Sequence, residues 1–345
     1  MTETETTPPQ DPGPDAAPDP SDGTSICIFS PTPLFTVTLE STVVGGKDDE
    51  PPVEGNQQLH LHVGGQGVWV GRMAHSFGAT VTLCAPFGGE TGQLARLLAE
   101  REGFHVEAID TAGWTGAYVH DRRGGERVEL LEVAPQPLSR HEVDDLYSVV
   151  LANALRCGTC IICGTHEHRV FDPDLFRRLA ADLHSNDVAV VADLSGEPLR
   201  ALLEGKPFTV KISHEELIAD GWAKGDSTKQ LLAGVDKIHA AGAERVVLSR
   251  AGEPAIASID GTRYEVRSPT MEVVDARGAG DSMTAALGVA AARRLDVVDA
   301  LRLAGAAGAA TVTRHGLATG KTDAVMAIAE RVEVVELARP AVKNR

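Results

Sequence analysis

Basic residues are scarce in this sequence. Its 32 lysines and arginines are outnumbered by 49 aspartates and glutamates, which gives a formal net charge of −17 at pH 7. An acidic chain is repelled by nucleic-acid phosphates and by anionic lipid surfaces, so we expect neither nucleic acid nor a membrane as a partner. A phosphorylated small molecule is not excluded, because phosphate binding depends on a few local groups.

Two further absences bear on location. No apolar run reaches the roughly 18 residues of a membrane span, and the N-terminus has no basic stretch followed by an apolar one. The five cysteines are an odd number, so a disulfide framework is not expected. These absences predict a cytoplasmic protein that is neither exported nor inserted into a membrane.

The cysteines that are present allow two interpretations. Cys157, Cys160 and Cys163 are evenly spaced and are followed by His166 and His168, a pattern found in metal sites. The apolar segment 159–163, however, predicts a strand, in which an offset of three places Cys160 and Cys163 on opposite faces. We therefore favour buried strand cysteines, and His166 stays a candidate for a substrate contact.

Residues 1–24 are rich in Pro, Asp, Glu and Thr and contain almost no large apolar side chain. Such a segment cannot bury enough surface to offset the entropy of ordering, so it predicts a disordered tail. The remainder of the chain supports one large domain over residues 25–338, with a short C-terminal tail at 339–345. The hydrophobic fraction of 43% fits a globular protein with a large core.

The order of the expected elements indicates the fold class. Extended pieces at 25–30, 35–44 and 59–63 come first, without helices between them. Strands then alternate with helices. The expected strands are at 80–85, near 118 and 128, and at 159–163, 188–193, 208–212, 245–248 and 255–266, and the expected helices at 68–77, 91–101, 139–155, 173–184, 198–203, 227–240, 297–312 and 322–332. This alternation predicts an α/β fold with a mainly parallel sheet and helices on both faces. Ligands bind at the carboxyl ends of such strands, where Asp193, Ser213 and Ser249 lie.

The stretch V-V-D-A-R-G-A-G-D-S-M-T-A-A-L at 273–287 is the most informative one. Val273 and Val274 predict the end of a strand, and a helix is expected from Asp281. Glycines at Gly278 and Gly280 permit a tight turn whose amides, at the positive end of the helix, favour an anion. Asp281 is placed to take a proton from a substrate hydroxyl, although Gly-Ala-Gly-Asp also fits an ordinary loop that ends in a helix N-cap.

Other segments match a known family in the same order. D-A-R-G-A-G-D-S is preceded by G-G-Q-G-V-W-V-G-R from residue 64, F-G-G-E-T-G from 87, D-L-S-G-E-P-L from 193 and K-I-S-H-E-E-L from 211. Together they resemble the ribokinase-like (PfkB) carbohydrate kinases over roughly residues 26–336, nearest the branch that contains the 1-phosphofructokinases and tagatose-6-phosphate kinases. The resemblance implies a ribokinase-like fold with a small β lid from about 34–63 and 115–133, ATP and Mg²⁺ as cofactors, and a homodimer through the lid.

The resemblance implies a role for each matched residue of the catalytic half. Asp281 corresponds to the general base, the amides of Gly278, Ala279 and Gly280 to the anion hole, and Glu216 to the residue that organises Mg²⁺. The implied nucleotide-binding residues are Lys211, Ser213, Ser249, Arg250, Gly252 and Asp275. Ser213 departs from the family, because it stands where the N-x-x-E motif has asparagine.

The sugar half departs further from the family. The positions implied to contact the substrate are Thr36, Gly65, Gln66, Gly67, Trp69, Tyr118 and His166. Thr36 replaces an aspartate, Gln66 a lysine and Trp69 an asparagine, while Gly116 and Tyr118 replace the arginine and asparagine of T-R-x-N. Loss of the lysine and arginine removes the charge-assisted hydrogen bonds that would hold a sugar phosphate, and Arg72 and Arg277 are candidates to replace them.

Three functions follow from these observations. We favour an ATP-dependent phosphotransferase that phosphorylates an alcohol group of a sugar or sugar-like molecule. A catalytically weak or inactive homologue that binds a ligand or regulates a partner is the alternative, because so many sugar-side positions are altered. An unrelated nucleotide-binding α/β protein is disfavoured by the ordered series of matching segments.

Overall fold

The computed structural model describes residues 23–41, 56–124, 127–164, 170–314, 316 and 318–337. Predictions for residues 1–22 and 339–345 and for His166 fall outside these residues. Thr24, which we assigned to the tail, is buried, and its carbonyl accepts a hydrogen bond of 2.8 Å from the amide of Thr80. Thr24 therefore packs with the domain that we expected to begin at Ser25.

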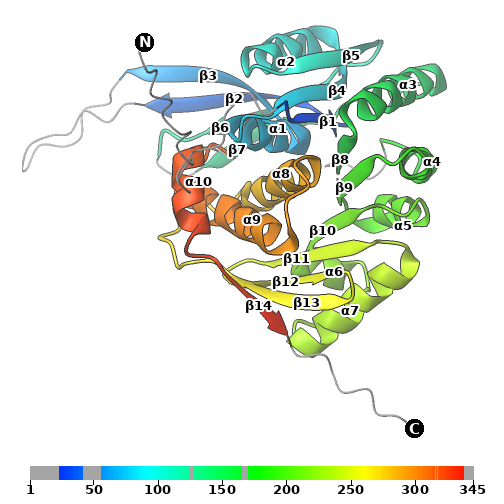
Figure 1. Cartoon of the computed structure of the whole chain (residues 1–345). Coiled ribbons are helices and arrows are strands. Elements are labelled where there is room, and N and C mark those ends of the chain that lie inside the picture. The colour runs from blue at the N-terminus through cyan, green and yellow to red at the C-terminus, as the bar shows by residue number, and fades with distance from the viewer. Residues whose placement is uncertain are drawn as a thin grey trace, which may run out of the picture.

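Ten strands of the described chain form the main sheet, in the order β14-β13-β12-β11-β10-β9-β8-β1-β4-β5 (Figure 1). They are β1 Ser25–Phe29, β4 Thr80–Gly88, β5 His105–Thr111, β8 Thr159–Cys163, β9 Ala189–Asp193, β10 Thr209–Ser213, β11 Arg245–Arg250, β12 Glu253–Ile259, β13 Thr262–Arg267 and β14 Glu333–Leu337. The strands from β11 to β5 pair in parallel, and β12, β13 and β14 add an antiparallel edge. The predicted mainly parallel α/β fold is confirmed, but β5 and β14 were missed.

Helices cover both faces of this sheet (Figure 1). One face packs against α1 Gln66–Ser76, α2 Gly89–Arg101, α8 Ala279–Ala292, α9 Val297–Thr311 and α10 Thr322–Ala329. The other packs against α3 Arg140–Cys157, α4 Asp174–Ser185, α5 Gly196–Glu204, α6 His214–Ala219 and α7 Thr228–Ala241. Cys163 belongs to the first core and Cys160 to the second, which confirms that they lie on opposite faces of β8. Within the described residues, no three His, Cys, Asp or Glu side chains gather as metal ligands.

A second, four-stranded sheet in the order β3-β2-β6-β7 forms what we call the lid. Its strands are β2 Leu34–Ser41, β3 Gln57–Gly64, β6 Gly116–Asp121 and β7 Val128–Val133. β2 pairs in parallel with β6 and antiparallel with β3, so Thr36 lies between His62 and Tyr118 on one face. The opposite face is apolar and exposes Leu59, Leu61 and Leu131. The lid contacts α2 through β2, β3 and β6.

Two local predictions were wrong, and one helix was missed. Val273 and Val274 lie in no strand: their side chains are 62% and 44% exposed, and the amide of Val274 donates to the carbonyl of Val312 at the end of α9. Tertiary contacts therefore override the β propensity of valine here. The last helix was predicted to run to residue 332 but ends at Ala329, and the next residues lead into β14. The short helix α6 after β10 was not predicted. None of the described helices is long and apolar enough to span a bilayer.

Candidate active site

The N-terminus of α8 forms the centre of the site. Gly278 is its N-cap and has the left-handed φ of 77°, which glycine adopts without strain. A glycine cap has no side chain to accept hydrogen bonds from the first-turn amides, so those amides are available to an anion. Asp281 lies in the first helical turn and is not the cap itself. The alternative of an ordinary Asp N-cap is therefore wrong.

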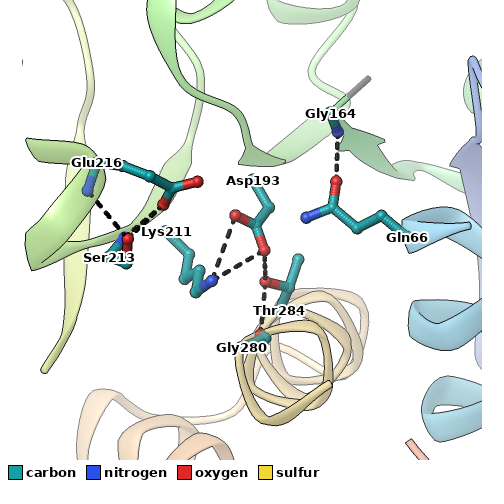
Figure 2. Close-up of polar contacts among 8 residues, drawn as sticks. All are labelled: Gln66, Gly164, Asp193, Lys211, Ser213, Glu216, Gly280 and Thr284. Carbon is teal, nitrogen blue, oxygen red and sulfur yellow. Dashed lines mark hydrogen bonds and ion pairs between the residues drawn. The ribbon is translucent and has the colours of Figure 1, made fainter. Parts of the chain in front are cut away.

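A buried ion pair lies directly beside this turn (Figure 2). Nζ of Lys211, on β10, is 3.1 Å from Oδ2 of Asp193, at the end of β9. The hydroxyl of Thr284, one helical turn after Gly280, donates to the same carboxylate oxygen over 2.6 Å. A β-carbon added to Gly280 would lie 2.6 Å from Nζ of Lys211, so only glycine leaves room for the ammonium. The ammonium is thus held against the Gly278 turn.

The carboxyl group of Asp281 is tuned by the same neighbours. Burial, and then repulsion by Asp193, raise its pKa to about 7, whereas the charge of Lys211 and a hydrogen bond with Gln66 act in the opposite direction. The pKa of Lys211 is itself raised: burial opposes the charge, but Asp193, Asp281 and Glu216 outweigh it. A carboxylate that titrates near neutral pH is suited to accept and release a proton.

Gln66 is the first residue of α1, and the structure places it between Gly164 and Asp281. Its Oε1 accepts a hydrogen bond from the amide of Gly164, as Figure 2 shows, so its amide nitrogen is left to donate to Asp281. Glycines hold α1 in this place: a β-carbon on Gly67 would lie 2.4 Å from Cβ of Ser30, at the end of β1. Gln66 was predicted to contact the substrate; in the structure it contacts the predicted base.

Ser213 and Glu216 form a capping box at the start of α6. The Glu216 carboxylate accepts from the Ser213 amide (2.9 Å) and hydroxyl (2.7 Å), and the Glu216 amide donates to the Ser213 hydroxyl (3.2 Å). All the side-chain bonds use Oε2, and Oε1 accepts no hydrogen bond from the described residues. The S-x-x-E spacing is itself a helix-start signal, and it predicts the helix that we missed.

The other predicted nucleotide-binding residues lie on two neighbouring segments. Ser249 pairs in register with Ser213 at the carboxyl ends of β11 and β10, and Arg250 and Gly252 continue into the turn before β12. Asp275 instead faces the lid. It accepts hydrogen bonds of 2.9 and 2.7 Å from Arg277 and lies 3.6 Å from Nη2 of Arg122.

Three residues that were predicted to contact the acceptor lie at the lid. Thr36 and Tyr118 are on the face that we call the inner face, and Trp69 is on α1 at the base of the lid. A β-carbon on Gly64 would be 2.8 Å from the Thr36 hydroxyl and 3.8 Å from the Trp69 ring, so these two side chains flank one point. Trp69 is partly buried against the core, and Tyr118 stands opposite Thr36. Gly65 caps α1 with a φ of 96°.

Two residues that the sequence left unassigned belong to the site, and one candidate, Arg72, is already paired. Asp193 was noted only as a strand end, although an acid that closes an apolar strand can be a buried partner for a lysine. Thr284 lies three residues after Asp281 on the same helix, a spacing that places both on one face. Arg72 donates to Glu102 over 2.6 Å and to the carbonyl of Val63 over 3.0 Å, and both bonds use its Nη2.

Comparison with known proteins agrees with this geometry. The model of the pfkB family carbohydrate kinases matches residues 41–324. The chain belongs to this family. It is 28% identical to a 1-phosphofructokinase of Borreliella burgdorferi over 290 residues, which cover 82% of this chain and 93% of the relative. It is also 28% identical to an ATP-dependent 6-phosphofructokinase isozyme 2 of Mycobacterium tuberculosis, over 76% of this chain and 77% of the relative.

Solved structures support the same fold. Phosphofructokinase-2 from Escherichia coli in complex with potassium superimposes with a TM-score of 0.76 at 22% identity, over 89% of this chain and 99% of the other. A ribokinase from Arabidopsis thaliana, complexed with ribose and ATP, gives a TM-score of 0.67 at 19% identity over 89% of this chain and 99% of the other. The protein is therefore a PfkB-family phosphotransferase with the ribokinase-like fold.

Proposed function

We propose that the protein transfers the terminal phosphoryl group of ATP to an alcohol group of a sugar or sugar-like molecule, with Asp281 as the general base. The observation that carries the proposal is the position of Asp281, whose pKa is about 7, in the first turn of α8 beside Gly280 and Lys211. Phosphoryl transfer needs such a base next to donors that hold the transferring charge.

Each group then has one task. Asp281 accepts the proton of the attacking hydroxyl, while the amides of Gly278, Ala279 and Gly280 and the ammonium of Lys211 stabilise the charge on the phosphoryl oxygens. Asp193 and Thr284 keep the ammonium at the turn. Gln66 orients the Asp281 carboxylate. ATP supplies the phosphoryl group and would lie along Ser213, Ser249, Arg250 and Gly252.

The residues present fit a magnesium ion held mainly by phosphates. Mg²⁺ usually takes one or two protein carboxylates and completes its shell with phosphate oxygens and water. Glu216 offers Oε1 at the end of β10 for this purpose. The site also needs the cation, because Asp193, Asp281 and Glu216 together outnumber the single ammonium of Lys211 beside a polyanionic nucleotide. Mg²⁺ would supply neutralisation of the phosphates.

The acceptor is expected to differ from the phosphofructoses named in the relatives. A sugar phosphate opposite Gln66 and Gly116 has lost two cationic partners of the family, and each lost charged hydrogen bond costs on the order of 1.5–3 kcal/mol. Two such losses weaken binding by roughly 10²- to 10⁴-fold. The acceptor therefore lacks a phosphate or carries one that is bound by other residues.

The test is an assay of ADP release with sugars, polyols, nucleosides, fructose 6-phosphate and fructose 1-phosphate, repeated with the Gln66→Lys, Trp69→Asn double variant. We expect the wild type to consume ATP with at least one acceptor and to use both phosphofructoses poorly. Efficient use of either phosphofructose would overturn our account of the acceptor site. A folded protein that consumes no ATP with any acceptor would support the alternative of a ligand-binding or regulatory homologue.

The lid also suggests an assembly. Leu59, Leu61 and Leu131, 60%, 42% and 53% exposed, gather with Val37 and Val119 on its outer face. We propose a cytoplasmic homodimer in which two such faces cover each other, because a large exposed apolar patch marks an interface. Sedimentation of Leu61→Lys at micromolar concentration should show a monomer beside a wild-type dimer, and a wild-type monomer would contradict the proposal.

A further inference from the structure

Three arginines from two separate parts of the chain meet at the edge of the lid. Arg122 and Arg127 flank the turn between β6 and β7, and Arg277 directly precedes the Gly278 turn. Nη2 of Arg122 and Nη2 of Arg277 lie 3.6 and 2.7 Å from the same Oδ2 atom of Asp275. The Asp275 carboxylate therefore pairs with both Arg122 and Arg277, and the third arginine, Arg127, lies close by.

Arg127 is the member without a carboxylate partner among the described residues. Its guanidinium lies over the ring of Tyr118, 4.9 Å from the centroid, and its buried Nε has no hydrogen-bond partner in the described chain. Burial lowers the pKa of Arg127, and the neighbouring charges of Arg277 and Arg122 act in the same direction. A buried donor with no partner is costly, and ligand binding is one way in which proteins offset that cost.

A nearby histidine reports the same positive potential. His120 is on β6, and its ring lies 5.4 Å from that of Tyr118. Burial, followed by the charges of Arg127, Arg122 and Arg277, lowers the pKa of His120 to about 4. The three arginines around this one side chain concentrate positive charge, part of which Asp275 offsets, in a protein whose net charge is −17.

We propose that Arg122, Arg127 and Arg277 form a phosphate-binding site between the lid and the Gly278 turn, which receives a phosphate group of the acceptor. Guanidinium groups bind phosphate oxygens through paired hydrogen bonds, and an unused Nε is one of the donors for such a pair. The site lies on the inner face of the lid beside Tyr118, one residue from the anion hole.

This inference rests on the proposed kinase function and deepens it. Gln66 and Gly116 lack the cationic groups that the family's phosphosugar branch has at those positions, and the arginine site would replace them from other elements. A purely structural role, in which Arg122 fastens the lid to Asp275 and Arg127 packs on Tyr118, accounts for these contacts but leaves Nε of Arg127 without a partner in the described chain. The phosphate could also belong to the nucleotide, since Arg277 is next to Gly278.

The experiment measures binding of inorganic phosphate, without turnover, by calorimetry on the full chain. The variants are Arg127→Gln and Arg277→Gln, with Arg123→Gln as the matched control. Arg123 is in the same turn, but its guanidinium is 41% exposed and pairs with Asp121 at 2.7 Å. We expect about tenfold weaker phosphate binding or more in each of the first two variants, as for a lost charged hydrogen-bond pair, and no change in the control.

Repeating the titration with saturating ADP and Mg²⁺ identifies the source of the phosphate. Binding that persists beside ADP assigns the site to the acceptor, and binding that ADP abolishes assigns it to the nucleotide and overturns the proposal. Wild-type affinity in Arg127→Gln, or no phosphate binding by the wild type at tens of millimolar, also overturns it. If Arg127→Gln does not fold, the phosphate affinities of Arg127→Lys and Arg277→Gln are compared with that of the wild type instead. Failure of the kinase function would appear as missing ATP turnover with this phosphate binding unchanged.

Discussion

The carboxyl edge of the main sheet and the inner face of the lid differ in how they are built. At the sheet edge, Asp193, Lys211 and Thr284 form one buried network against α8, and the G-A-G-D motif matches the family. On the lid, Thr36 and Tyr118 stand where the family has other side chains. In the function that we propose, phosphoryl transfer and acceptor recognition are carried by separate elements, so the acceptor can change while the transfer centre stays the same.

Removing the base tests the sheet edge most directly. We expect Asp281→Asn to lower kcat by about 10²- to 10⁴-fold, the range for a lost general base, without loss of the fold. Steady-state assays with an identified acceptor measure this. The exposed Asp145→Asn on α3 serves as the control, and wild-type activity in Asp281→Asn would show that Asp281 is not the base.

Asp281→Asn, which should lower activity, should in contrast raise the stability of the folded protein. The pKa of Asp281 is raised in the folded state, so its contribution to stability is present at acidic pH and is lost as the pH rises through about 7. Asparagine has no charge to bury. We therefore expect Asp281→Asn to raise the melting temperature at pH 8 and to have less effect at pH 5. An equal effect at both pH values would indicate that the Asp281 carboxylate is solvated and that its pKa is not raised.

Separating the buried ion pair is the next largest perturbation. In Lys211→Met, Asp193 stays buried without its cation, which should cost about 3–5 kcal/mol of unfolding free energy. Urea titration of Lys211→Met, Asp193→Asn and the double variant measures the coupling. We expect the double variant to recover part of the loss, because neither charge is stranded. A fully additive double variant would mean that the two groups do not interact.

Sequence and structure can be compared at particular residues. The glycine turn, the strand ends at Asp193 and Ser213 and the opposite faces of Cys160 and Cys163 follow from local pattern and strand geometry, and they were predicted. The irregular conformation of Val273 and Val274 was not predicted, because the amide of Val274 bonds to the end of α9, about forty residues on. The roles of Gln66 and Thr284 depend on contacts between separate elements, which no local pattern contains.

Gln66 follows the lid strand β3 by two residues and contacts Asp281, and changing it should produce a smaller, pH-dependent effect. Its hydrogen bond to Asp281 opposes the rise in pKa of that carboxyl group. In Gln66→Met we expect the acid limb of the pH profile of kcat/KM to move upward, with a loss of about tenfold at pH 6 and little loss at pH 9. The exposed Gln58→Met on β3 is the control. A profile unchanged in shape would mean that Gln66 contacts only substrate.

Ligand binding should also stabilise the sheet edge. ATP with Mg²⁺ at 100 times Kd stabilises a native state by about 2.7 kcal/mol, which should raise the melting temperature by several degrees. Glu216→Gln should reduce the part of the shift that depends on Mg²⁺. No shift at millimolar nucleotide, with the protein shown to be folded, would favour a role that does not involve ATP.

The pairing of β2 with β6 has a consequence for how the protein folds. The buried hydrogen bond between Thr38 and His120 joins residues 82 apart in the chain, and the main-sheet strands β4 and β5 form between them. Pairing of β4 with β5 shortens the effective loop between Thr38 and His120, so the lid contact forms at a lower entropic cost after that step. We expect the lid to assemble after the sheet on which it rests and to exchange its amide hydrogens sooner, as a cooperative unit of its own.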